Sequence, residues 1–216
     1  MSNLIQVGCN VGDEYIFELV RDKKINFCIF IDANKKALEK CKENLQKFFE
    51  KVDIDWKFRS EFINCAVSNI NSPTIKLHIP TGDDYSNHSS LDETFPTISE
   101  HKKGFDSVEV QNFSINSIFN EFDLKRIDYL FIDVEGADRG IIENLNWGKY
   151  KILNIKFEFA HWGGWQGYDD PEKLASLQNL LYLFILNGYK IYRSSTTDFS
   201  ASKIQNWVEN YNDDKD

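Results

Sequence analysis

Two groups of residues in this sequence have types and spacing suited to chemistry, and the first is a pair of glycines near the start. Gly8 and Gly12 follow a short apolar run, Leu4–Val7, and precede an amphipathic segment. Glycine lets the backbone approach a ligand closely, and a helix that starts there points free N–H groups at the same place. The order strand, glycine turn, helix therefore predicts a binding site for a ligand with polar groups.

An acidic residue, Asp32, ends the second apolar run, 20 residues after Gly12. In nucleotide-binding sheets an acid at this position bonds the hydroxyls of a ribose. The glycines have the spacing G-x-N-x-G, not the G-x-G-x-x-G of dinucleotide enzymes. A helix-capping aspartate in a purely structural turn is the alternative, but the strand order, the glycines and the acid together favour a ligand that contains a ribose.

The second group consists of side chains at the ends of two later strands. Asp133 ends the run 127–133 and Glu135 follows it, while Glu158 and His161 end the next run. Ligands bind outside the carboxyl ends of the strands in open α/β sheets, so we expect these side chains to face one cleft. Asp133, Glu135 and His161 are the catalytic candidates, with Asp133 first in line to take a proton from an acceptor group.

The same carboxylates also suit a metal ion. Oxygen ligands are what Mg²⁺ and Mn²⁺ prefer, and Asp133 and Glu158 are the predicted ligands. His161 is a candidate for either the general base or a third ligand. For Glu135 a structural salt bridge with Arg139 is the alternative to a role in catalysis.

A loop rich in aromatic residues and glycine follows at the same predicted edge. Trp162, Trp165 and Tyr168 alternate there with three glycines, and Glu158 lies just before them. Aromatic faces beside carboxylates can form a platform for a sugar ring, so these four residues are predicted to bind substrate. Packing of the tryptophans onto the last helix is an equally good explanation of the pattern.

The remaining pattern is a strand–helix alternation, which predicts one α/β domain over residues 1–216. Residues 62–67 form a nearly continuous apolar run that predicts the third strand, and the span of about 70–112 is predicted to be an irregular insertion holding one extra strand, 74–79. The acidic end, 212–216, is predicted to fray. Helices are expected at 13–23, 34–49, 114–122 (capped by Ser114 or Asn116), 141–145 and 170–187, and late strands at 189–193 and 197–200.

Composition narrows the class of partner and the compartment. The chain has 216 residues and a net charge of −9, which argues against nucleic acid and against an anionic membrane surface as partners. No apolar run is long enough to span a bilayer. The four scattered cysteines are expected to be buried free thiols, as in a cytoplasmic protein.

Several segments together resemble the FkbM-type methyltransferases, which belong to the S-adenosylmethionine-dependent, Rossmann-like class. The resemblance implies a mostly parallel seven-stranded sheet flanked by helices and methyl transfer to oxygen, often on sugars or other small natural products. The matching segments, in the family's order, are VGCNVGDE (7–14), FIDANKKAL (30–38), INCAVSN (63–69), HSSL (88–91), IDYLFIDVEGAD (127–138) and IKFEF (155–159).

By position, the resemblance also assigns roles to residues. The glycine turn would lie beneath the methionine part of S-adenosylmethionine, Asp32 would hold the ribose, and Ser89 and Ser90 would lie near the polar end of the cofactor, although a plain loop explains the serines equally well. Asp133 and Glu158 are placed like the magnesium ligands of catechol O-methyltransferase. The implied cofactor site comprises Val7, Gly8, Asn10, Gly12, Asp13, Asp32, Ala33, Asn64, Cys65, Ala66, Ser89, Ser90 and Asp133.

The expected activity is therefore S-adenosylmethionine-dependent O-methylation of a sugar, a glycan or another small polyhydroxylated acceptor. There are two alternatives: a nicotinamide-dependent oxidoreductase and a non-catalytic S-adenosylmethionine-binding partner subunit. Binding of S-adenosylhomocysteine or of NAD distinguishes the methyltransferase from the oxidoreductase. A partner subunit, a second copy of the chain or a further domain of a longer protein could complete the acceptor side.

Overall fold

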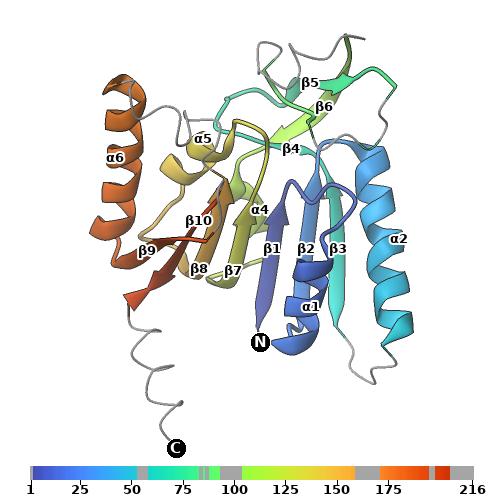
Figure 1. The fold of residues 1–216 in the computed structure, drawn as a ribbon, viewed down its shortest axis with the longest axis horizontal. Coiled ribbons are helices and arrows are strands. Elements are labelled where there is room, and N and C mark those ends of the chain that lie inside the picture. The colour runs from blue at the N-terminus through green and yellow to red at the C-terminus, as the bar shows by residue number, and fades with distance from the viewer. Residues whose placement is uncertain are drawn as a thin grey trace, which may run out of the picture.

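A twisted sheet of seven strands forms the centre of the protein (Figure 1). The computed structural model describes residues 2–52, 58–82, 85, 88–92, 104–158, 171–194 and 198–204. The strands lie in the order β3-β2-β1-β7-β8-β10-β9. Their bounds are β1 Asn3–Val7, β2 Phe27–Asp32, β3 Arg59–Asn64, β7 Arg126–Ile132, β8 Lys151–Glu158, β9 Tyr189–Arg193 and β10 Asp198–Lys203.

The sheet is mixed, and its reversed strand lies near one edge. Five neighbouring strands, from β3 to β8, run parallel, whereas β10 is antiparallel to both β8 and β9. The close connection between β9 and β10, where the amide of Ser194 donates to the carbonyl of Asp198, reverses the chain. The expectation of a mostly parallel sheet of seven strands is confirmed, with this one reversal.

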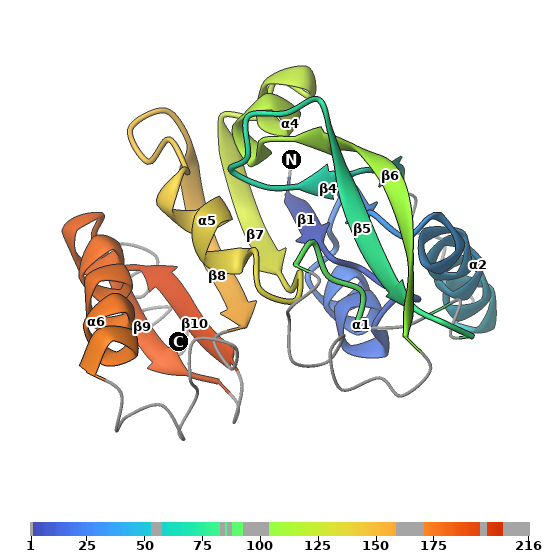
Figure 2. The same cartoon turned by 90° about the horizontal axis from the view of Figure 1, so that it is seen from above.

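Helices cover both faces of the sheet (Figure 2). The helices α1 (Glu14–Asp22) and α2 (Lys35–Lys51) pack their buried residues with Leu4, Cys28 and Phe30 on one face. On the other face, α4 (Ile115–Glu121), α5 (Asp138–Glu143) and α6 (Pro171–Leu186) contribute to a larger apolar cluster. Strands buried on both faces explain the nearly continuous apolar runs of the sequence.

Polar side chains cap the starts of α1, α2 and α4. The side chain of Asp13 accepts from the amide of Tyr15, and Asn34 accepts from the first turn of α2. Ser114 caps α4 by accepting from the amide of Ser117, so Ser114, not Asn116, is the cap. Each cap satisfies an N–H group that has no partner inside its helix.

The run 62–67 is not one strand, as the sequence had suggested. It divides at Cys65 into the end of β3 and β4 (Ala66–Val67), which leaves the main sheet. A second sheet, in the order β4-β6-β5, lies across the carboxyl ends of the central strands (Figure 1). It contains β5 (Thr74–Pro80) and β6 (Phe105–Phe113), so the described part of the insertion is more regular than predicted.

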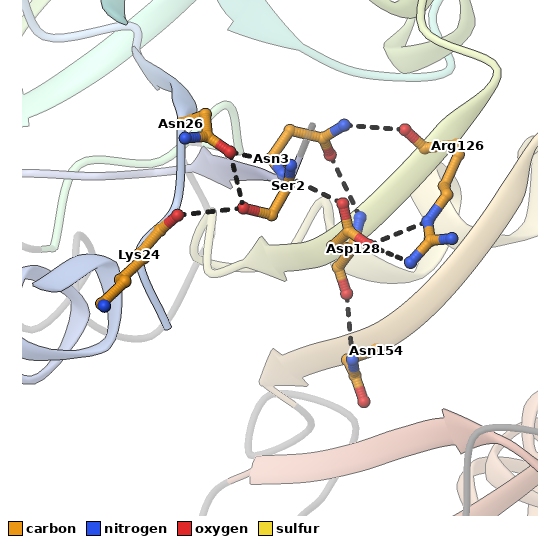
Figure 3. A network of polar contacts seen from close by, with 7 residues as sticks. All are labelled: Ser2, Asn3, Lys24, Asn26, Arg126, Asp128 and Asn154. Atoms are coloured by element: carbon orange, nitrogen blue, oxygen red, sulfur yellow. Dashed lines mark hydrogen bonds and ion pairs between the residues drawn. The ribbon is translucent and has the colours of Figure 1, made fainter. Parts of the chain in front are cut away.

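A polar network fixes the register of the strands at the opposite, amino-terminal edge of the main sheet (Figure 3). The buried Asp128 carboxylate accepts from the backbone N–H of Asn3 at 3.0 Å and from the Arg126 guanidinium at 2.7 Å. In return, the Asn3 side chain bonds the backbone of Asp128 and Arg126, and Asn154 donates to the Asp128 carbonyl. The network ties β1, β7 and β8 together and so fixes where their carboxyl ends fall.

All four cysteines are buried free thiols, as predicted. Within the described part of the chain, no helix combines the length and the apolar character that crossing a membrane requires. The terminal segment 212–216, which was predicted to fray, lies outside the described residues.

Candidate active site

A pocket of about 280 Å³ lies at the carboxyl ends of β1, β2 and β7, beneath the second sheet. Many of the residues that line it were indicated by the sequence, and the glycine turn between β1 and α1 forms its floor. Of the residues predicted to bind the cofactor, the pocket is lined by Val7, Gly8, Asn10, Gly12, Asp13, Asp32, Ala33, Cys65, Ala66, Ser89 and Asp133.

The glycine turn has a shape that side chains would not allow. Gly8 and Gly12 have φ angles of +79° and +86°, in the left-handed region. A Cβ atom on Gly8 would lie 1.7 Å from the carbonyl oxygen of Asp133, and one on Gly12 would lie 2.4 Å from the ring of Phe17. Both glycines are therefore required, and Gly8 brings the ends of β1 and β7 into direct contact.

The Asp32 side chain stabilises this turn by hydrogen bonds to the backbone. One carboxylate oxygen accepts from the backbone N–H of Asn10 at 2.7 Å, and the other accepts from that of Asn34 at 2.8 Å. Burial raises the pKa of Asp32 to about 6, although these two hydrogen bonds act against the shift. Each oxygen keeps a lone pair, so Asp32 can brace the loop and also accept from a ligand in the pocket.

Two side-chain amides in the pocket wall have unused acceptors. Among the described residues, the oxygens of Gln6 and Asn10 are buried and accept no hydrogen bond. Buried polar atoms almost always have partners, so a donor from a ligand is the natural complement. Asn10, with a φ of +44°, was expected here, but Gln6 was not, since it lies within the apolar run that forms β1.

The upper wall is apolar and comes from the second sheet. Val67, Leu77 and Leu91 line the pocket opposite the glycine turn. Sequence reasoning did not assign these residues, although Leu77 lies in the extra strand that was predicted at 74–79. An apolar wall facing a polar turn suits a ligand with a flat aromatic end and a charged end.

Two residues predicted to contact the cofactor lie beside the pocket instead. Asn64 donates from its side chain to the backbone carbonyls of Asp32 and Ala33, at 2.9 and 3.0 Å, and so braces the end of β2. Ser90 is buried and donates from Oγ to the carbonyl of Glu135 at 2.9 Å. Both residues support the pocket wall from behind.

Three carboxylates meet at the end of β7 and β8. Asp133, Glu135 and Glu158 each place an oxygen within 4.8 Å of the other two. Asp133 and Glu135 also line the pocket, so the cluster adjoins the ligand site. The prediction that these three side chains lie close together is therefore confirmed.

The environment of Asp133 favours its protonated form. Surrounding protein withdraws water from the carboxyl group, and the negative charges of Glu158, Asp138 and Glu135 lie nearby, which together raise the pKa of Asp133 to about 8. Because the Asp133 side chain is exposed to solvent, the nearby negative charges are the main reason that its protonated form is favoured. An aspartate with such a pKa can exchange a proton near neutral pH.

Asp138 shapes the turn that carries the cluster, a role that the sequence did not reveal. Its carboxylate accepts from the backbone N–H groups of Val134 and Gly136, both at 3.3 Å. Burial, with only 1% of the residue exposed, raises the pKa of Asp138 to about 7. The following residue, Arg139, pairs with Glu143 at 2.7 Å, not with Glu135 as the alternative interpretation had it.

The predicted catalytic His161 and the predicted substrate residues Trp162, Trp165 and Tyr168 lie outside the described residues. Of the predicted substrate group, only Glu158 is described, and it belongs to the carboxylate cluster.

Comparison with known proteins agrees with this arrangement. The family model of the methyltransferase FkbM domain matches residues 6–190. Over 190 residues the chain is 25% identical to the 2-O-methyltransferase NoeI of Sinorhizobium fredii (strain NBRC 101917 / NGR234), a match that covers 85% of this chain and 72% of the relative.

The fold is also similar to that of a solved structure, the methyltransferase FkbM from Methylobacillus flagellatus KT. The TM-score is 0.50 at 12% identity, and the match covers 93% of this chain but 42% of the other. The chain thus spans less than half the length of that neighbour. The family match extends over the glycine turn, the second sheet and the carboxylate cluster, and on that basis the chain belongs to the FkbM methyltransferase family.

Proposed function

We propose that the protein transfers a methyl group from S-adenosylmethionine to a hydroxyl group of a sugar, a glycan or another small polyhydroxylated molecule. One observation carries the proposal. Asp133 lines the pocket that has the features of a nucleotide site, and it is also a member of the carboxylate cluster. A group able to take a proton therefore lies at the boundary between a donor site and an open cleft.

The pocket offers a partner for each part of S-adenosylmethionine. Asp32 would accept from the ribose hydroxyls, and the apolar wall at Leu77 and Leu91 would cover the adenine. The unused oxygens of Gln6 and Asn10 suit the ammonium group of the methionine end, which needs acceptors. When bound, this cofactor supplies an electrophilic methyl group on a sulfonium centre.

The protein residues have two tasks in such a reaction. They hold the acceptor oxygen in line with the methyl group, and proximity of this kind can supply much of the rate. They also remove the proton of the acceptor hydroxyl, and we assign this task to the Asp133 carboxylate. As the proton leaves, the new carbon–oxygen bond forms and the carbon–sulfur bond of the cofactor breaks. Glu135 and Glu158 keep the proton affinity of Asp133 high enough for this transfer.

A divalent cation is the alternative occupant of the cluster. Asp133 and Glu158, joined by Glu135, present the oxygen ligands that Mg²⁺ and Mn²⁺ favour. A cation held there would make the acceptor hydroxyl more acidic. Activity that survives excess EDTA would exclude this alternative, whereas loss in EDTA and recovery on adding Mg²⁺ would favour it.

A sugar acceptor is proposed on two grounds. The relative NoeI is described as a 2-O-methyltransferase, and the sequence carries an aromatic, glycine-rich segment, with Trp162, Trp165 and Tyr168, directly after Glu158. If Trp165 contributes a platform, Trp165→Ala should raise the KM for the acceptor far more than the KM for the cofactor.

Calorimetry tests the donor site without knowledge of the acceptor. The protein should bind S-adenosylhomocysteine, and Asp32→Ala should weaken that binding, whereas NAD should not bind. Binding of NAD alone would overturn the proposal in favour of an oxidoreductase. Labelled S-adenosylmethionine with a panel of sugars then tests the acceptor class: label should appear in a neutral sugar with the wild-type protein, and the Asp133→Asn variant should transfer little.

A further inference from the structure

The outward face of α6 (Pro171–Leu186) is unusual among the described surfaces because, from Ala175 onward, it carries no charged side chain. The sequence from Ala175 to Asn187 contains no Asp, Glu, Lys or Arg, in a chain of which 27% is charged. Its solvent-facing positions recur every three or four residues, which places them on one side of the helix. These exposed residues are Ala175, Gln178, Asn179, Tyr182, Ile185 and Leu186.

The same face holds the most exposed large apolar side chains. Tyr182, Ile185 and Leu186 are 59%, 61% and 66% exposed, the three highest values for large hydrophobic residues among those described. They stand at spacings of three and four residues and so form one patch. Single exposed apolar residues are ordinary, but a contiguous patch marks an interaction surface.

The fold does not need this patch for its own core. The opposite side of α6 supplies the buried residues Leu180 and Phe184, and Phe184 stacks on Phe157 of β8 with ring centroids 5.2 Å apart. The helix lies at one end of the molecule, against β9 (Figures 1 and 2). Its outer side is therefore accessible to another molecule.

We propose that the outward face of α6 binds the same face of a second copy of this chain, related by a two-fold axis. An uncharged apolar face has no electrostatic means of selecting an acidic or a basic partner, but it complements a face like itself. Two copies that each carry a net charge of −9 repel each other, and the part of α6 from Ala175 to Leu186 brings no charged side chain that would add to this repulsion. In a two-fold contact whose axis passes beside Ile185 and Leu186, each of these residues lies next to its own counterpart in the other copy, and Tyr182 lies at the rim.

The neighbouring strand edge points to a contact through the helix, not through strand pairing. β9 is the last strand of the main sheet, and its exposed Lys190 opposes pairing with another edge. A sixteen-residue helix is about 24 Å long, so the contact is of modest size and we expect a dimer of micromolar affinity. The pocket, between β1, β2 and β7, is not covered by this arrangement.

Sedimentation velocity from about 1 µM to about 500 µM tests the proposal. The wild-type protein should pass from monomer to dimer in this range, and Leu186→Glu should raise the dissociation constant at least roughly tenfold, because two glutamates then face each other across the axis. Ile70→Glu is the matched control, since Ile70 is also exposed (51%) but lies on a turn between β4 and β5. Circular dichroism should show that both variants are folded.

Cysteine cross-linking provides a second, independent test of the dimer. All four native cysteines are buried, so under a mild oxidant Ile185→Cys should form a disulfide-linked dimer and Ile70→Cys should not. A wild-type monomer at every concentration, or a dimer that Leu186→Glu leaves intact, would overturn the proposal. So would binding to neutral phosphatidylcholine vesicles that Leu186→Glu abolishes, because the face would then be a membrane contact.

Discussion

The Ser90 hydroxyl donates a hydrogen bond to the backbone carbonyl of Glu135, at 2.9 Å, and this bond joins the second sheet to the turn that carries the carboxylate cluster. Ser90 is itself fixed to His78 of β5 by two backbone hydrogen bonds, at 2.8 and 3.1 Å. Glu135 has a φ of +53°, a conformation that costs of order 1–3 kcal/mol for a residue other than glycine. Ser90 is thus one of the contacts that hold Glu135 in a strained position beside Asp133.

Replacement of Ser90 by alanine should therefore lower activity without removing a ligand contact. We expect Ser90→Ala to reduce kcat about tenfold, because Glu135 would relax away from the cluster, and to change the affinity for S-adenosylhomocysteine little. Steady-state kinetics and calorimetry measure the two effects. Ser72→Ala is the control, since Ser72 also donates to a backbone carbonyl of the second sheet, that of Thr74, but lies outside the pocket. Equal losses in the two variants would show that Ser90 only stabilises the sheet.

Gly8 should tolerate no side chain. Its Cβ would lie 1.7 Å from the carbonyl of Asp133, so Gly8→Ala must separate β1 from β7 or unfold the turn. We expect a lower melting temperature and no measurable binding of S-adenosylhomocysteine. Gly148→Ala provides the comparison, because the nearest atom to a Cβ there is 3.8 Å away and the melting temperature should hardly change. Normal cofactor binding by Gly8→Ala would contradict this prediction, because the turn would then have adjusted to accommodate the side chain.

The parts of the site that depend on neighbouring residues in the chain were predictable from the sequence. Gly8, Gly12 and the cap at Asn34 follow from local rules that link a residue type to a backbone conformation. The meeting of Asp133 with Glu158 followed from one further rule, that parallel strands end at the same edge of a sheet.

Contacts that depend on distant pairing were not predictable. The bond from Ser90 to Glu135 spans 45 residues and exists only because β5 pairs with the segment at Ser90. The apolar run 62–67 gave no sign of leaving the main sheet at Cys65, since apolar residues continue on both sides of that position. β6 was missed because most of its side chains are exposed and polar, which hides the apolar periodicity of a buried strand.

Affinity for the cofactor should depend on pH through Asp32. Its pKa of about 6 means that the carboxylate gains a proton as the pH falls through 6, and the proton removes an acceptor for the ribose hydroxyls. Calorimetry with S-adenosylhomocysteine should show weaker binding at pH 5 than at pH 8. Asp32→Asn should bind roughly tenfold more weakly at pH 8, about 1.4 kcal/mol, and should lose most of this pH dependence. An unchanged pH profile in the variant would contradict the role of Asp32.

Asp138 should make stability fall as the pH rises. Its folded-state pKa of about 7 lies above the ordinary value of 3.8, so between these values the folded protein binds the extra proton and each rise in pH disfavours folding. The contribution of Asp138 to the free energy of unfolding is greatest below pH 4 and is lost as the pH passes 7. Between these values the free energy of unfolding falls by at most about 1.4 kcal/mol per pH unit. Urea unfolding from pH 5 to pH 8 should give a flatter curve for Asp138→Asn. Glu143→Gln, at an exposed site on the same helix, should keep the wild-type slope.

Asp133 should set the pH dependence of methyl transfer. In EDTA, with saturating cofactor, kcat should rise as the pH passes about 8, because the carboxylate that accepts the proton becomes the main form only above its pKa. Asp133→Asn cannot take the proton, so it should lose about 10²–10⁴-fold in kcat and the rising limb with it. Glu109→Gln, on the exposed part of β6, should retain both. A rising limb that persists in Asp133→Asn would assign the base to another residue, for which His161 is the remaining candidate from the sequence.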